Sequence, residues 1–291
     1  MDWSSLALLS AFSLASADAI TKRYLSHYAL FEIVITRFVV TAIILLPSAF
    51  LHPFPVTLPA RFWVIVALLV PLEIVAMFLY MRAISIAPLS STLPYMAFTP
   101  VFVTLTGYLI LGEVVSVYGF FGIVLVVIGA WGLNLEYARR DLVRTWIAPF
   151  KAILTNEGSR LMLLTALIYS VTSVLGKAAM DYIPPEQFGP YYWVLIGFVI
   201  LILFSIRRRD ALTVISRQPV VHLVLGVFMA IMVLAHFESL AQIETAYMIA
   251  VKRTSLLFGI LFGILFFKEV RGMQYLASGS LMVAGVVLIV L

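Results

Sequence analysis

The chain has 291 residues, of which 63% are hydrophobic and 11% are charged, and its mean hydropathy is +1.11. Globular domains have about 45–50% apolar and about 25% charged residues, so this composition excludes an ordinary soluble fold and an intrinsically disordered chain. The net charge of +5 lies in scattered clusters between apolar runs, which argues against a nucleic-acid-binding face, and the lack of cysteine excludes disulfides and thiolate chemistry.

Ten apolar runs are long enough to cross a bilayer, which takes about 20 helical residues. In chain order they cover roughly 3–21, 30–51, 62–81, 89–110, 115–135, 161–180, 188–206, 219–240, 245–267 and 272–291. They are continuously apolar rather than alternating, which argues against a transmembrane barrel. Prolines in the connections favour helix ends there. We therefore predict an all-α membrane protein with ten transmembrane helices.

The longest connection between predicted spans, 136–160, is basic and contains apolar residues, including Trp146. This pattern predicts an amphipathic helix at the membrane interface, although a solvated basic connector would have the same composition. The predicted organisation is a first five-helix unit at 1–135, this linker at 136–160, and a second five-helix unit at 161–291.

The two units resemble each other. Residues 80–129 align without gaps onto 236–285 at a constant shift of 156, and the matched identities include Phe102 with Phe258, Gly107 with Gly263, Glu113 with Glu269 and Gly129 with Gly285. Because each unit holds an odd number of spans, the second unit must enter the membrane from the opposite side. The sequence therefore predicts an inverted repeat, the architecture of many secondary transporters.

Short motifs in both units resemble the EamA family of the drug/metabolite transporter superfamily. They are Ala87-Pro88-Leu89-Ser90, Leu111-Gly112-Glu113-Val114 and Gly129 in the first unit, and Lys252-Arg253-Thr254-Ser255, Lys268-Glu269-Val270 and Gly285 in the second. The resemblance implies ten helices in two inverted fives, a central cavity, and transport of small metabolites such as amino acids. It usually implies export, by exchange or proton coupling. Lys268 departs from the family pattern, because glycine precedes the matching Glu113.

The candidate substrate-binding or coupling residues are ionisable and aromatic side chains within or at the ends of spans. A charged group inside the membrane costs free energy, so its presence indicates a function. They are Arg37, Glu73, Tyr80, Tyr95, Lys177, Tyr192, His236, Glu238, Lys252 and Arg253. No catalytic residue, metal ligand or cofactor is predicted.

The most informative pair is Lys252 and Arg253, which lie about 12 Å into their predicted span and have no charged counterpart in the first unit. One interpretation is an anion or carboxylate site, with Arg253 as a bidentate clamp. The alternative is a buried salt bridge to Glu238 or Glu73.

The remaining ionisable groups have competing interpretations. A carboxylate at Glu73 or Glu238, or His236, would suit proton coupling, whereas hydrogen-bonded helix packing would use the same residues. Arg37 could pair with Glu73 or face a cavity.

Other polar and small residues are expected to act mainly in the fold. Asp18 and Lys22 have the spacing of a structural helical pair. Glu113 and Glu269 would each stabilise the start of the helix that follows them. Gly259 and Gly263 form a GxxxG motif, which favours close helix packing.

Basic residues also predict orientation. Connections after odd-numbered spans hold fourteen lysines and arginines, whereas the others hold only Arg61. The positive-inside rule then places both termini outside, while the family resemblance implies termini in the cytoplasm.

We predict a secondary active transporter, with export the expected direction, for a small polar or amphipathic metabolite. It would work in the plasma or inner membrane, as a monomer or homodimer, by alternating access. A channel, a non-transporting receptor and a membrane-embedded enzyme are the alternatives. The channel and the enzyme lack their expected signatures, namely a continuous polar ring and a nucleophile–base or metal cluster.

Overall fold

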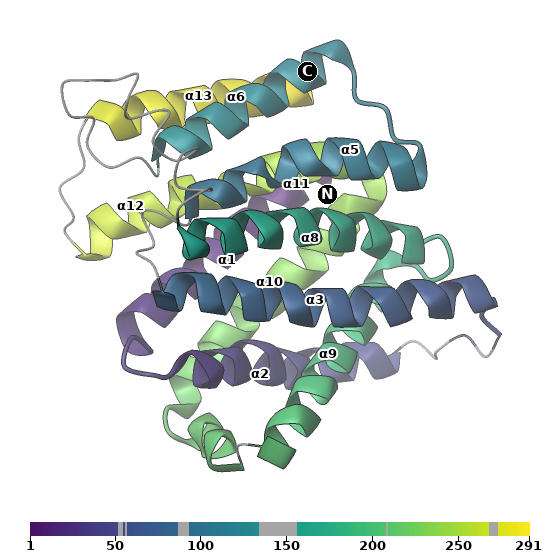
Figure 1. Ribbon diagram of the computed structural model, residues 1–291, viewed down its shortest axis with the longest axis vertical. Coiled ribbons are helices and arrows are strands. Elements are labelled where there is room, and N and C mark those ends of the chain that lie inside the picture. Colours follow the sequence, from purple (N-terminus) through teal and green to yellow (C-terminus); the bar gives the residue numbers. More distant parts are fainter. Residues whose placement is uncertain (52–54, 56, 87–92, 134–155, 208, 268–272) are drawn as a thin grey trace.

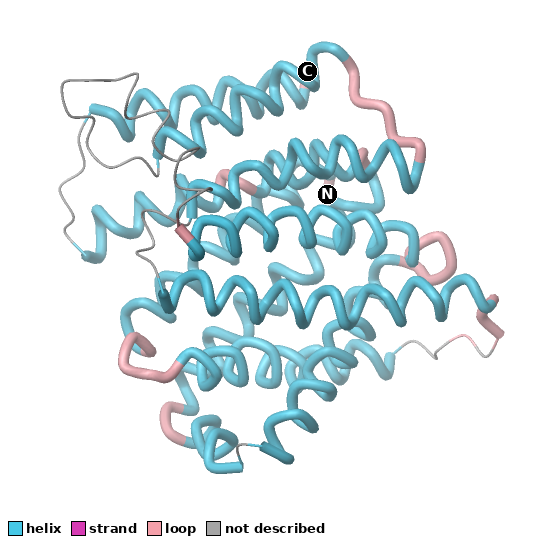
Figure 2. Tube along the Cα trace, in the orientation of Figure 1, coloured by secondary structure: helices cyan, strands magenta, loops and turns pink. Residues whose placement is uncertain are grey.

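The computed structural model describes residues 1–51, 55, 57–86, 93–133, 156–207, 209–267 and 273–291, and every regular element in them is helical (Figure 2). The elements are α1 (Trp3–Tyr24), α2 (Leu30–Leu51), α3 (Ala60–Ile86), η1 (Leu93–Phe98), α5 (Thr99–Leu111), α6 (Val117–Leu133), α8 (Glu157–Ala179), α9 (Pro185–Arg207), η2 (Arg209–Ser216), α10 (Pro219–Gln242), α11 (Thr245–Lys252), α12 (Ser255–Phe267) and α13 (Met273–Val290).

Seven of the described helical segments are long and apolar enough to cross a membrane, as judged by length and composition. Three shorter apolar segments, Tyr95–Leu111, Val117–Gly132 and Ala277–Val290, fall on the remaining predicted runs. The all-helical membrane fold is therefore confirmed, whereas the count of ten crossings stays a prediction.

Two predicted spans, 89–110 and 245–267, each change helix type or contain a turn, although apolar helical segments still run over Tyr95–Leu111 and Thr245–Gly263. In the first, η1 ends at Phe98 and α5 begins at Thr99, with a proline in its first turn. Proline cannot donate a backbone hydrogen bond, and in the first turn of α5 this donor is not needed within the helix. In the second, α11 ends at Lys252 and α12 begins at Ser255. The helices after the two breaks begin at positions separated by the repeat shift of 156.

Helices pair across the two halves of the chain in a reciprocal pattern. The first helix of one half packs on the third of the other, as α1 with α10 and α8 with α3. The second helices pair as α2 with α9, and the fifth helices pair as α6 with α13. Figure 1 shows α6 and α13 side by side at one edge of the bundle, with α2 and α9 toward the opposite edge.

The packing of α6 on α13 depends on small residues at matched positions. A Cβ added to Gly122 would lie 2.8 Å from the Gly285 carbonyl oxygen, and one added to Gly129 would lie 2.6 Å from the Ser278 carbonyl oxygen. In the alignment of the two repeats, which has a constant shift of 156, Gly122 matches Ser278 and Gly129 matches Gly285. Each contact is therefore the repeat-related partner of the other, and the backbones approach closely because no side chain intervenes.

Side chains cap the starts of α1 and α8. The Asp2 carboxylate accepts hydrogen bonds from the Ser4 hydroxyl, from the Ser5 hydroxyl at 2.6 Å and from the Ser5 backbone N–H at 3.3 Å, and these bonds hold the pKa of Asp2 well below its usual range. The Asn156 side chain accepts from the Ser159 N–H at 3.2 Å. Residues 157–160 of the predicted linker therefore belong to α8, and its residues 136–155 lie outside the described part of the chain.

Candidate functional site

Ionisable and hydroxyl-bearing side chains from both halves lie near one another in the middle of the bundle. We call this group the central cluster. It comprises Arg37 of α2, Glu73 and Tyr80 of α3, Tyr169 of α8, Tyr192 of α9, His236 of α10, Lys252 of α11, and Arg253 at the break before α12. The sequence predicts all of these residues as candidates except Tyr169.

Arg37 is the paired cation of the central cluster. Its Nη1 atom lies 2.7 Å from Asp18 Oδ1 on α1, and its Nη2 atom lies 3.5 Å from the Met229 sulfur on α10. We predicted that Arg37 pairs with Glu73 or faces a cavity, and neither prediction included Asp18 as its partner. The ion pair with Arg37 connects α1 to α2, and the predicted pairing of Asp18 with Lys22 along α1 stays a prediction. Because the Asp18 side chain is 56% exposed, this pair lies at the edge of the cluster.

The amino group of Lys252 contacts two uncharged acceptors, an imidazole nitrogen and a thioether sulfur. Its Nζ atom lies 3.2 Å from His236 Nδ1 and 3.4 Å from the Met232 sulfur. An ammonium group can only donate, so His236 accepts at Nδ1 and carries its ring proton at Nε2 when neutral. This contact leaves the positive charge of Lys252 without compensation from a direct anionic partner among the described residues.

Arg253 is the least satisfied cation of the cluster. Tyr80 and Tyr169 lie near its guanidinium group, while its Nε atom is buried and has no hydrogen-bond partner in the described structure. The expected alternative, a salt bridge from Lys252 or Arg253 to Glu73 or Glu238, is not found within 4 Å in the described ranges. A buried guanidinium nitrogen without an acceptor is costly, so this position favours an acceptor that the chain itself does not provide.

Glu73 is the carboxylate of the cluster. It lies on α3, near the side chains of Thr172 and Tyr192. Lys252 is the cation close enough to attract its charge. The Tyr192 hydroxyl is buried but is not in hydrogen-bonding geometry with Glu73 or with any other described group. The cluster therefore contains a cation, Arg253, and a hydroxyl donor, Tyr192, that both lack acceptors, and its carboxylate lies near Lys252 and Tyr192.

A second polar group closes the end of the bundle where α11 begins, which we call the Thr245 end. Lys177 Nζ lies 2.6 Å from Glu113 Oε1 and donates to the Ile243 carbonyl oxygen at 2.6 Å. Glu113 also accepts from the Thr245 backbone N–H at 2.9 Å and from its hydroxyl at 3.0 Å. Lys177 and Glu113 are mostly buried, with exposed side-chain fractions of 22% and 11%. This network joins the two halves and satisfies both charges.

The position of Glu113 corrects the expectation that it stabilises the next helix in the chain. Its carboxylate bonds to the first backbone N–H of α11, from the other half, rather than to the start of α6. Gly112, at φ +71°, ends α5 in the left-handed conformation that glycine adopts without strain. A Cβ on Gly107 would lie 2.8 Å from Glu113 Oε2, so the carboxylate folds back over a position that only glycine leaves open. The matching Glu269 lies outside the described residues.

Two further predicted residues lie away from the central cluster. Tyr95 is fully buried against Trp131, with ring centroids 5.7 Å apart, in a small separate core. Glu238 lies near the chain's amino terminus and Glu186, at the Thr245 end. Lys177, as described above, is in the Thr245 network. Of the ten candidates, seven lie in the central cluster and these three do not.

Two cluster neighbours, Tyr169 and Asp18, were not among the predicted site residues. The sequence could not identify Tyr169 as a site residue. A tyrosine in an apolar span looks the same in the sequence whether its side chain faces lipid or the interior of the bundle. Asp18 gave a signal, a charge within a span, and its spacing to Lys22 predicted a partner on the same helix. Its contact with Arg37 depends on how α1 and α2 are placed in the bundle, which one sequence does not reveal.

Comparisons with known proteins agree with this architecture. The EamA-like transporter family matches residues 1–135 and 157–291. None of the curated proteins matches the chain. One protein of known crystal structure has the same fold, with a TM-score of 0.77 over 100% of this chain and 99% of that one, at 13% sequence identity. The two family matches cover nearly the whole sequence, and the chain belongs to the EamA-like transporter family, within the drug/metabolite transporter superfamily.

Proposed function

We propose that the protein is a secondary active exporter of a small polar or amphipathic metabolite with an anionic group, such as an amino acid or a related carboxylate. Substrate would bind at the central cluster, between the two halves, and reach either side of the membrane by alternating access. Proton coupling or exchange would supply the energy.

The observation that carries this proposal is the unsatisfied Arg253 at a helix break. Arg253 follows the eight residues of α11, so it lies about 12 Å from the Thr245 end, well inside a bilayer core of about 30 Å. A guanidinium group binds a carboxylate with two parallel hydrogen bonds. Substrate would thus supply the acceptor that Arg253 Nε lacks.

The break places two cations together. Arg253 lies two residues before the start of α12, at Ser255, and the next backbone N–H groups bond to the Arg253 and Thr254 carbonyl oxygens, so side chains would supply the positive charge for an anionic ligand. Discontinuous helices that end near the bilayer midplane form the substrate sites of many secondary transporters. Lys252 adds a second positive charge at the same place.

Alternating access is supported by the reciprocal packing of the two halves. The pairs α1 with α10 and α8 with α3 exchange under the repeat, as do the two glycine contacts between α6 and α13. Halves related in this way can exchange conformations at similar energy, which opens a shared site to either side.

Glu73 and His236 are the proposed coupling groups. Both lie in the central cluster and both neighbour Lys252. Protonation of Glu73 would remove the negative charge that helps to offset Lys252, and so would strengthen the attraction of the cluster for an anion. Substrate and proton would then favour the same loaded state and move in the same direction, so in this scheme export would be driven by exchange with a second solute rather than by the inward proton gradient.

A two-stage experiment tests this function. The purified chain is first screened by thermal shift against amino acids, organic acids, nucleosides and quaternary amines, and we expect stabilisation by compounds that carry a carboxylate. A labelled hit is then used for counterflow in proteoliposomes. Uptake that is stimulated by unlabelled solute on the far side is expected of a carrier, whereas a channel would show none.

A further inference from the structure

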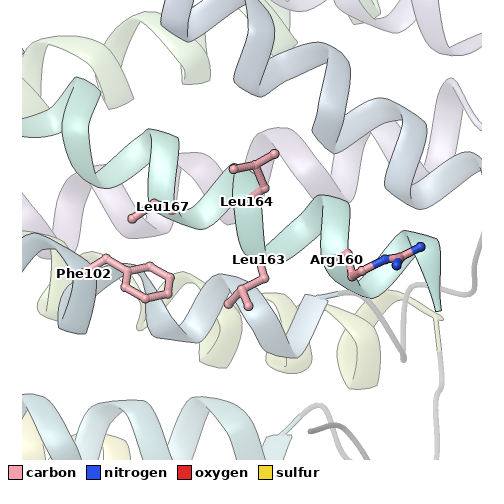
Figure 3. A pocket seen from close by; sticks show the side chains of 5 residues that line it. All are labelled: Phe102, Arg160, Leu163, Leu164 and Leu167. Atoms are coloured by element: carbon pink, nitrogen blue, oxygen red, sulfur yellow. The ribbon is translucent and has the colours of Figure 1, made fainter. Parts of the chain in front are cut away.

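A cavity of about 270 Å³ lies between α5 and α8, away from the central cluster (Figure 3). Its lining consists of Phe102 on α5 and Arg160, Leu163, Leu164 and Leu167 on α8. The four α8 residues have the i, i+3, i+4, i+7 spacing, so they share one face of the helix. Phe102 and Arg160 lie at opposite ends of the lining, with the leucines between them.

The cavity opens toward the surface of the bundle. Leu164 and Leu167 are 44% and 41% exposed, and α8 is one of the helices long and apolar enough to cross the membrane. Exposed leucines on such a helix face acyl chains rather than water. The apolar part of the cavity therefore suits a hydrocarbon chain.

Arg160 gives the cavity one charged end at the depth of lipid headgroups. It lies in the first turn of α8 and is exposed. Leu167 is seven residues further along, about 10 Å deeper at 1.5 Å per residue. This separation matches the step from a lipid phosphate to the upper acyl chain, because the headgroup region is several Å thick on each side of the core.

The charges at this end favour an anionic lipid. Among the described residues Arg160 forms no ion pair, while neighbouring Glu157 is offset by Arg82 at 3.8 Å. By sequence, the connections after odd-numbered spans, which include the one that ends at Arg160, hold fourteen of the chain's lysines and arginines, and we predict that they share one side of the membrane. Basic pockets between membrane helices on such a side bind the headgroups of anionic lipids.

We propose that this cavity is a binding site for an anionic phospholipid, with the phosphate on Arg160 and one acyl chain along Leu163, Leu164, Leu167 and Phe102. Because α5 belongs to the first half of the chain and α8 to the second, the bound lipid spans the seam between the halves. Its occupancy stabilises the present arrangement of α5 and α8. The site does not depend on the proposed transport function or on the central cluster.

The test is thermal unfolding of the purified full chain in detergent micelles, with added phosphatidylglycerol, phosphatidylcholine or sodium phosphate. Phosphatidylglycerol is expected to raise the unfolding midpoint at lower concentration than phosphatidylcholine, and phosphate alone is expected to have no effect. Arg160→Gln should raise the phosphatidylglycerol concentration needed about fivefold, since one basic residue near an anionic headgroup contributes about that factor. Arg160→Lys should retain most of the response.

Two further variants complete the test. Arg61→Gln removes an exposed arginine from the first turn of α3, at the opposite end, and is expected to leave the lipid response unchanged. Leu167→Trp fills the apolar part of the cavity and should weaken the response to both phospholipids. Equal responses to the two phospholipids, an equal effect of free phosphate, or equal losses in Arg160→Gln and Arg61→Gln would each overturn the proposal.

Discussion

Lys177 and Arg253 are both basic residues of the second half, yet their surroundings differ. Lys177 has a carboxylate at 2.6 Å and a backbone carbonyl oxygen at 2.6 Å, and its carboxylate partner is itself bonded to the start of α11. Arg253 has a buried Nε atom without an acceptor in the described structure, and the groups near it include two tyrosines, His236 and Lys252. The charge of Lys177 is paired within the fold, whereas Arg253 has a buried donor atom without an acceptor.

The difference separates two uses of charge inside a membrane protein. Removing one partner of a satisfied buried pair strands the other, so such a pair contributes to stability once it is present. An unpaired buried cation costs free energy in the empty protein, and a ligand that pairs with it recovers that cost. We therefore expect substitutions at the Thr245 network to affect stability, and substitutions at Arg253 to affect substrate binding.

The largest expected effect is on substrate affinity. Arg253→Gln should weaken binding of the carboxylate substrate at least about 30-fold, because a buried charge-assisted contact contributes about 2 kcal/mol or more. The thermal midpoint of the empty variant should stay the same or rise, since an unpaired buried charge is removed. Isothermal titration and thermal unfolding check the two parts, and a large fall in stability with unchanged affinity would contradict the assignment.

Lys177→Met should show the opposite behaviour. It leaves Glu113 mostly buried beside Thr245 without its cation, which we expect to lower the free energy of unfolding by about 2–3 kcal/mol. Affinity for substrate in the folded fraction should change less than twofold, because Lys177 lies outside the central cluster. Chemical denaturation in micelles measures the first quantity. Glu113→Gln in the Lys177→Met background should recover part of the loss.

A pair of glycine substitutions examines the packing of the Thr245 end without changing charge. A Cβ on Gly119 would overlap the ring of Tyr247, whose hydroxyl oxygen accepts from the Ser116 N–H at 2.6 Å. Gly119→Ala is therefore expected to lower stability by about 1–3 kcal/mol. Gly259→Ala is the matched control, since nothing lies within 4 Å of its Cβ position. Equal thermal midpoints for the two variants would show that this end is not tightly packed.

The smallest effect is expected at an exposed ion pair. Glu157 lies 3.8 Å from Arg82, with exposed side-chain fractions of 57% and 62%. Solvent screens such pairs, and Glu157 also lies in the first turn of α8, so Glu157→Gln should change stability by less than about 1 kcal/mol. Thermal unfolding at low and high salt checks this expectation. A change as large as that for Lys177→Met would remove the distinction between buried and exposed pairs.

The fold class can be predicted from the sequence, because apolar runs and repeated motifs are visible in it. Runs of apolar residues and the spacing of Glu113 and Glu269 predict membrane helices in two related halves, and the family match confirms that membership. Helix breaks are harder to predict. The break before Thr99 has a proline signal, but the break after Lys252 has neither proline nor glycine nearby, and only tertiary packing specifies it.

The candidate site was partly predictable for a physical reason. Charge within an apolar span is rare and costly, so Arg37, Glu73, Lys252 and Arg253 are visible in the sequence. Their partners are not visible, because pairing depends on how neighbouring helices are rotated and shifted. In the GxxxG motif, no described atom lies within 4 Å of the Cβ position of Gly259, whereas Gly263 is buried, so close helix packing at this motif stays a prediction.

The most direct test of the central claim is solute counterflow in proteoliposomes that contain equal amounts of folded wild type, Arg253→Gln or Lys177→Met. If Arg253 receives the substrate, the wild type and Lys177→Met will both accumulate labelled carboxylate solute, and Arg253→Gln will not. Counterflow by Arg253→Gln at the wild-type rate would contradict the account, because substrate would then be carried without the cation proposed to bind it.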